Sequence, residues 1–111
     1  MDTIVWEDFE KIDLRSGTIK QLETFPKARK PAYKLWIDFG ELGIKKSSAQ
    51  ITVHYNPEEL VGKQVIAVVN FPPRQIADFI SECLVLGVYN QDGSVVLLQP
   101  DKTVTNGQKV G

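Results

Sequence analysis

Hydrophobic and polar residues alternate along several short segments of the chain, a pattern typical of β-strands with one buried face. The clearest case covers residues 33–39, where every second residue is apolar and a lysine and an aspartate lie between. Residues 12–22 and 45–53 alternate less regularly. These segments predict three strands, and Gly17 predicts a bulge or a sharp bend within the first.

The second half of the chain carries shorter apolar runs. Residues 64–70 form an apolar, β-branched run that the pair Pro72-Pro73 cannot continue, because proline lacks the backbone N–H. A second run covers residues 83–86 and ends at Gly87. Beyond it, two apolar segments flank residues 90–93, which end in Asp-Gly and predict a hairpin.

Two short helices are expected. Thr3 can cap a helix that carries Trp6 and Phe9 three residues apart, on one face. Asn56 followed by Pro57 and two glutamates is a second helix start, and this helix ends before residue 62.

The order of these elements predicts the fold class. We expect an all-β protein, a five-stranded OB-fold barrel with a short N-terminal helix and one helix between strands 3 and 4. C-terminal extension strands follow, the last of them at residues 109–110. No linker or repeat divides the chain, so residues 1–111 are expected to form a single domain.

The loop after the proline pair is the first candidate for function. It holds Phe71, Ile76, Phe79 and Ile80 with the single cation Arg74, more apolar surface than one loop of a small domain readily buries. One interpretation is a peptide-binding site made of Phe71, Arg74, Ile76 and Phe79. The alternative is that Phe79 and Ile80 plug the end of the barrel.

Composition narrows the class of protein. Of 111 residues, 42% are hydrophobic and 24% charged, which is typical of a globular domain and not of a disordered chain. No apolar run is long enough to span a bilayer, and the first residues lack the pattern of a secretion signal. We therefore expect no membrane insertion and a cytoplasmic location, with which a single cysteine agrees.

Charge is distributed unevenly. Residues 27–46 carry six cations against two carboxylates, a local charge of +4, whereas the net charge of the whole chain is −1. A solvated face and a site for an anionic partner are both open as explanations. The aromatic residues nearby favour a peptide- or RNA-binding face. Its candidate residues are Lys27, Arg29, Lys30, Tyr33, Lys34, Trp36, Lys45 and Lys46.

Catalytic patterns are missing from the sequence. His54 is the only histidine, and no cluster of ligating residues has metal-binding spacing, so neither a metal nor a cofactor is expected. Cys83 lies in an apolar run and predicts a packed, unreactive thiol. Arg15 has two interpretations, an ion pair with Asp13 that braces the strand or a contact to a ligand.

Apolar residues near both ends of the chain predict self-association. Trp6 and Phe9 near the N-terminus, and Val95 and Leu97 near the C-terminus, exceed what one small barrel covers. A homodimer with a two-fold axis would bury them.

Several motifs in register resemble the tRNA-binding domain family, which is appended to methionyl-tRNA synthetases and also occurs as free-standing dimers. Within that family the chain is most similar to the CsaA-type export chaperone branch. The likeness extends over nearly the whole chain and is carried by residues 13–19, 28–40, 60–65, 69–73 and 81–87.

The resemblance implies an OB-fold, a homodimer built through the terminal segments, and no catalysis. It implies binding of unfolded or precursor polypeptides in secretion, with links to the Sec export machinery. A free-standing tRNA-binding protein is the alternative. Members that bind tRNA carry a lysine-rich loop where this chain has residues 71–76, and apolar residues there favour peptide side chains over phosphates.

Overall fold

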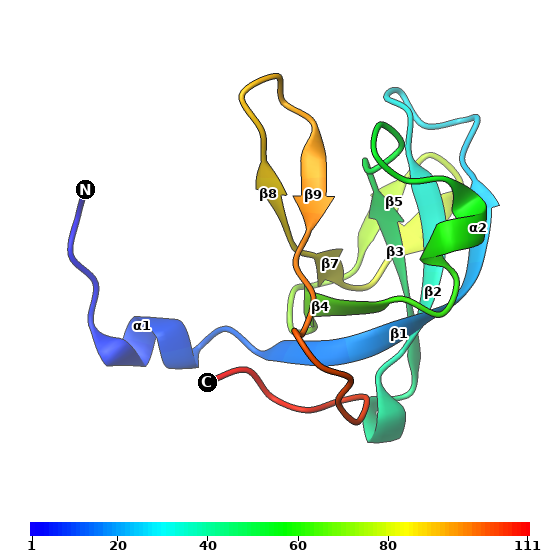
Figure 1. The fold of residues 1–111 in the computed structure, drawn as a ribbon. Coiled ribbons are helices and arrows are strands. Elements are labelled where there is room, and N and C mark those ends of the chain that lie inside the picture. The colour runs from blue at the N-terminus through cyan, green and yellow to red at the C-terminus, as the bar shows by residue number, and fades with distance from the viewer.

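Five strands wrap into a nearly closed antiparallel barrel in the computed structural model, which describes residues 1–111 (Figure 1). The predicted all-β, OB-type barrel is therefore confirmed. The strands lie side by side in the order β3-β2-β1-β4-β7. Their bounds are β1 Leu14–Thr24, β2 Tyr33–Asp38, β3 Ile44–Ala49, β4 Gln64–Val68 and β7 Leu84–Val85.

The gap between β3 and the segment before β7 is bridged mainly by one residue. The Glu82 N–H donates to the Lys46 carbonyl at 2.7 Å, and the Lys46 N–H donates to the Glu82 carboxylate at 2.9 Å. Ser47, which is buried, donates to the Cys83 carbonyl at 3.0 Å. These bonds satisfy backbone groups that an open edge of the sheet would leave exposed.

Gly17 is required for packing, and the bulge lies further along β1. The register of β1 against β2 shifts between Ile19 and Gln21. At Gly17 a Cβ atom would lie 2.7 Å from Ile37 Cγ2 and 2.8 Å from the Phe39 ring. The predicted bulge was therefore placed too early, because a glycine in a strand can also mark the close approach of another side chain.

The barrel core follows the alternation read from the sequence. Leu35, Ile37 and Phe39 on β2 and just after it are fully buried, as are Ile19 on β1 and Val65 on β4. We call one cluster of twelve buried residues the barrel core: Ile19, Tyr33, Leu35, Ile37, Phe39, Ala49, Ile51, Leu60, Val65, Ala67, Cys83 and Leu97.

Both predicted helices form, but the first begins later than predicted. Helix α1 covers Trp6–Glu10 with Val5 at its N-cap, not Thr3, and the Asp8 carboxylate accepts the Val5 N–H at 3.2 Å. Helix α2 covers Pro57–Leu60 behind Asn56, as predicted, and a 3₁₀ turn η1 covers Gly40–Leu42. Neither α-helix has the length or the apolar run needed to cross a bilayer.

The segment expected to be a loop after the proline pair is a small hairpin. Strand β5, Arg74–Ile76, pairs with β6, Phe79–Ser81, around a turn in which Ala77 has a φ of 52°. Residues 71–73, directly before β5, are irregular. The prediction missed these strands because each has three residues, too few to show a period of two.

A second two-stranded ribbon stands clear of the barrel (Figure 1). It consists of β8, Gly87–Tyr89, and β9, Val95–Leu97, and it confirms the predicted hairpin. Figure 1 also shows α1 lying away from the barrel and close to the C-terminus. The C-terminal segment crosses β1, where the backbones of Arg15 and Lys109 form an isolated antiparallel β-bridge.

Candidate functional site

A second, smaller apolar cluster lies on the outer side of β2. We call it the outer cluster: the buried residues Phe25, Ala32 and Phe79, with Ala28, Trp36 and Ile76 half-buried around them. The Phe79 ring stacks edge-on against Phe25 at 5.6 Å between centroids and against Trp36 at 5.8 Å. Hairpin β5–β6 and the basic loop before β2 thus meet over one aromatic core.

Two lysine ammonium groups lie over the rings of this cluster. Lys34 Nζ is 4.8 Å from the Phe25 centroid and 5.4 Å from the Phe79 centroid, and Lys46 Nζ is 5.3 Å from the Phe79 centroid. Lys34, Trp36 and Lys46 share the outer side because Trp36 is paired with Lys46 in the β2–β3 register. Neither lysine forms an ion pair with a carboxylate, although, beside the hydrogen bond and charge of Lys27, the charge of Lys34 lowers the pKa of Asp78.

Lys27 is engaged within the chain. Its ammonium group lies 3.1 Å from the Asp78 carboxylate in the β5–β6 turn and so ties the basic loop to the hairpin. The hydrogen bond from Lys27 holds the pKa of Asp78 below its ordinary value. Arg29 and Lys30 are exposed on the same loop and form no ion pair. They remain available to a partner.

The structure separates two predicted residues from this surface. Tyr33 is 7% exposed and belongs to the barrel core, and its hydroxyl donates to the Tyr55 carbonyl at 2.8 Å. It cannot stack on a base. Lys45 pairs with Ile37, which faces the core, so Lys45 and Lys46 project from opposite faces of β3. The sequence could not assign sides within the pair Lys45-Lys46 without the register.

The predicted apolar residues of the β5–β6 region have different positions. Phe79 is 5% exposed, so it supports the surface from below and offers no pocket wall of its own. Ile76 and Arg74 lie on the same side of the hairpin as Phe79, and Ile80 points the other way at 45% exposure. Phe71 is 54% exposed and is not part of the outer cluster.

Arg15 and Cys83 have structural roles. Arg15 Nε donates to Asp13 Oδ1 at 2.6 Å, and another guanidinium nitrogen donates to the Gly107 carbonyl at 3.0 Å. Arg15 therefore braces the C-terminal segment against β1. Cys83 is buried, and this burial raises the pKa of its thiol to about 12, as expected for an unreactive cysteine.

Val95 and Leu97, the two ribbon residues predicted to lie in a dimer interface, share the face of the ribbon that packs against the barrel. Leu97 is buried in the barrel core of its own chain, and Val95 is half-buried against that core. Their neighbours Val96 and Leu98 are 39% exposed, and Val88, directly opposite Val96, is 55% exposed. The alternation of residues 95–98 carried this signal, because successive side chains point to opposite faces.

Trp6 and Phe9, the other two predicted interface residues, lie on α1. Their ring centroids are 5.3 Å apart, and Trp6 is 62% exposed. Together with Ile12 and Val110 they line an apolar hollow of about 260 Å³ between α1 and the C-terminal segment.

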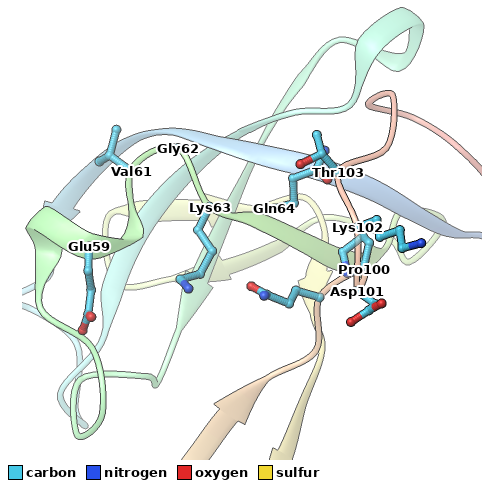
Figure 2. A pocket seen from close by; sticks show the side chains of 10 residues that line it. Glu59, Val61, Gly62, Lys63, Gln64, Pro100, Asp101, Lys102 and Thr103 are labelled. Carbon is cyan, nitrogen blue, oxygen red and sulfur yellow. The ribbon is translucent and has the colours of Figure 1, made fainter.

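The larger hollow, of about 410 Å³, is polar (Figure 2). Figure 2 shows Lys63 and Glu59 on one side, and Asp101 and Lys102 on the segment that follows β9. Its two cations and two carboxylates leave no net charge. Gln64 fastens this segment by donating to the Val104 carbonyl at 2.7 Å and accepting the Val104 N–H at 3.0 Å. No group of three metal-ligating side chains occurs in the structure.

Comparison with solved structures gives several full-length matches, among them two chaperones. The chaperone CsaA from Bacillus anthracis strain Ames is 55% identical with a TM-score of 0.94, covering 99% of this chain and 100% of that one. The CsaA chaperone protein from Picrophilus torridus is also 55% identical, with a TM-score of 0.92 over 98% of this chain and 100% of that one. The similarity to CsaA chaperones predicted from the sequence motifs is confirmed.

Comparison with curated proteins gives a different kind of match. A methionine–tRNA ligase from Porphyromonas gingivalis is 41% identical over 109 residues, 98% of this chain and 16% of the ligase. The chain thus spans about one sixth of the length of the curated relatives it matches. The family model described as "Putative tRNA binding domain" matches residues 14–109. The chain belongs to this tRNA-binding domain family.

Proposed function

We propose that the chain is a non-catalytic chaperone that binds unfolded polypeptides at the surface over the outer cluster. The observation that carries this proposal is the pair of unpaired ammonium groups of Lys34 and Lys46 beside the half-exposed ring of Trp36. An extended polypeptide offers apolar side chains to the indole, and carboxylates and carbonyl oxygens to the ammonium groups. The similarity to two CsaA chaperones supports the proposal.

The test is suppression of aggregation of a denatured client at stoichiometric chaperone. We expect the wild type to suppress light scattering and the double variant Lys34→Glu/Lys46→Glu to lose most of this effect. The matched control is Lys63→Glu/Lys102→Glu, which makes the same change of charge at the polar hollow. Unchanged aggregation with the wild type would end the chaperone proposal, and equal losses in both double variants would move the site elsewhere.

A free-standing tRNA-binding role is the second candidate, and the family model and the ligase match favour it. It uses the same cations with Trp36 stacking on an unpaired base. Gel retardation with tRNA at two salt concentrations separates the two functions. A complex that weakens steeply with salt supports RNA binding, whereas no shift at low salt contradicts it, because phosphate contacts are strongest there.

We also propose a homodimer formed through the exposed apolar residues of the ribbon and α1. Val88, Val96 and Leu98 on the ribbon, and Trp6 on α1, carry this surface in place of Val95 and Leu97. A two-fold axis would let one patch cover the same patch of a second copy. Light scattering at micromolar concentration should give twice the 12.5 kDa of one chain. The mass of one chain would contradict it.

The CsaA resemblance extends the proposal to precursor polypeptides handed to the Sec export machinery from the cytoplasm. The absence of a helix that could cross a bilayer is compatible with action in an aqueous compartment. Affinity capture with the tagged chain should enrich precursors that still carry their signal peptides over their mature forms. Equal recovery of both forms would restrict the function to general polypeptide binding.

A further inference from the structure

The surface over the outer cluster already holds a carboxylate of its own chain. Asp78 lies in the turn of the β5–β6 hairpin, and its Oδ2 atom is 3.1 Å from Lys27 Nζ on the basic loop. The two residues are 51 positions apart in the chain. Of the three ion pairs in the structure, this is the one that involves a cation of the basic loop.

Buried neighbours hold this ion pair in position. Phe79, which directly follows Asp78, is 5% exposed, and Phe25, two residues before Lys27, is 4% exposed. Their rings are in edge-on contact, with 5.6 Å between the centroids. The aromatic core that lies under the two ammonium groups of the outer cluster therefore also fixes the positions from which Lys27 and Asp78 meet.

Asp78 is an anion placed among the cations of this surface. The hydrogen bond from Lys27 is the largest cause of its lowered pKa, and the charge of Lys34 acts in the same direction, so the carboxylate is ionised at neutral pH. Glu82, a carboxylate beside β3, is used differently, because it accepts the Lys46 N–H and forms no ion pair. An acidic side chain of a bound polypeptide would be attracted by the same cations as Asp78.

The ion pair is weak enough to exchange partners. The side chains of Lys27 and Asp78 are 69% and 51% exposed. An exposed pair of this kind changes an equilibrium by about fivefold or less, and salt screens it further. Asp78 thus occupies Lys27 without removing it from reach, and a carboxylate of a client can replace Asp78 while the buried Phe79 keeps the hairpin in place.

We propose that Asp78 is an internal competitor for acidic segments of the client, since it occupies Lys27 until a carboxylate of the bound polypeptide displaces it. This rests on the proposed chaperone function and names its ligand class, extended segments that carry several carboxylates beside an apolar side chain. A first carboxylate is attracted by Lys34 or Lys46, whereas a further one gains Lys27 only by displacing Asp78. Asp78 therefore lowers the affinity for acidic segments and leaves the affinity for neutral segments unchanged.

The test is fluorescence anisotropy of the full chain with two labelled, unstructured peptides of equal length and equal apolar content. One peptide carries several glutamates, and the other carries glutamines at the same positions. At low salt we expect Asp78→Asn to bind the acidic peptide about threefold to fivefold more tightly than the wild type does, and the neutral peptide equally well. The gain should shrink as salt screens the charges.

Three further variants identify the cause of the gain. Asp101→Asn removes the same charge at the polar hollow and should leave both affinities unchanged. Asp78→Glu keeps the carboxylate and should bind as the wild type does. Lys27→Gln lacks the cation for which Asp78 competes, so adding Asp78→Asn to it should raise the affinity for the acidic peptide much less.

Equal affinity of the wild type and Asp78→Asn for the acidic peptide, or an equal gain in Asp101→Asn, would overturn the competition. So would an undiminished gain in Lys27→Gln, because Asp78 would then act only through its long-range charge. Failure of the proposed function looks different: neither the wild type nor Asp78→Asn binds either peptide, aggregation of a denatured client is unchanged, and the competition fails with it. A gain for tRNA in Asp78→Asn without one for the acidic peptide would assign the surface to RNA.

Discussion

The barrel core and the outer cluster each bury a phenylalanine, but they surround it with different neighbours. Phe39 is fully buried among aliphatic side chains of strands that close around it. Phe79 is nearly as buried, yet it lies under two ammonium groups and beside the half-exposed Trp36. Burial by itself therefore does not separate a structural aromatic residue from one that supports a binding surface. The charged groups around the ring distinguish the two.

This difference has a physical consequence for each cluster. The barrel core gains only from the removal of apolar surface from water. The outer cluster gains from the same effect and, in addition, positions Lys34 and Lys46 by attraction to the ring faces. A side chain removed from the outer cluster should alter both stability and binding, whereas one removed from the barrel core should alter stability alone.

The largest effect is expected for Phe39→Ala. The cavity left in the barrel core should lower the free energy of unfolding by about 4 kcal/mol. Denaturant unfolding measures this loss, and Phe39→Leu, which keeps most of the volume, is the control. Ligand affinity of the folded fraction should not change. A loss below about 1 kcal/mol would contradict the close packing of this ring against its neighbours.

Phe79→Ala is expected to cost about 3 kcal/mol, less than Phe39→Ala because part of the outer cluster is exposed to solvent. It should also weaken ligand binding, since Lys34 and Lys46 lose the ring on which they lie. Phe79→Leu divides the two effects: stability should largely return, while binding stays weak. Full recovery of binding in Phe79→Leu would mean that the ring does not position the lysines.

Reversal of the free cations on the basic loop should act on binding alone. We expect Arg29→Glu/Lys30→Glu to lower affinity by about tenfold to thirtyfold at low salt and to flatten the salt dependence, at roughly 1 kcal/mol or less for each exposed contact. Titration by fluorescence anisotropy at two salt concentrations measures it. Lys27 is left intact because its reversal would also repel Asp78. Unchanged affinity would reduce this loop to a solvated face.

The smallest effect concerns the ion pair of Lys27 and Asp78. Because Lys27 lowers the pKa of Asp78 in the folded chain, the carboxylate stabilises the fold above the ordinary aspartate pKa of about 3.9. That contribution disappears as the pH falls through the lower, folded value. Thermal melts of the wild type should therefore exceed those of Asp78→Asn slightly at pH 7 and converge in strong acid. If the wild type still melts at a higher temperature than Asp78→Asn in strong acid, the difference comes from packing and not from the ion pair.

Local sequence patterns were sufficient to predict several elements of the fold and the family of the chain. The alternation of residues 33–39 defined β2 and the buried face that contributes Leu35, Ile37 and Phe39, because a strand has a fixed period of two. Asn56 and Pro57 defined the start of α2 through the geometry of a helix N-terminus. The motifs in register also identified the family that the comparisons confirmed.

Tertiary structure decided which residues share a surface. Lys45 and Lys46 are equivalent in sequence, and only the pairing of Lys46 with Trp36 puts one of them beside Phe79. His54 meets Ser94 across forty positions of chain, a contact that no local pattern encodes. Alternation fixes the relative sides of residues within one strand, but which strand or ribbon lies opposite depends on how the barrel closes, and that is a property of the whole chain.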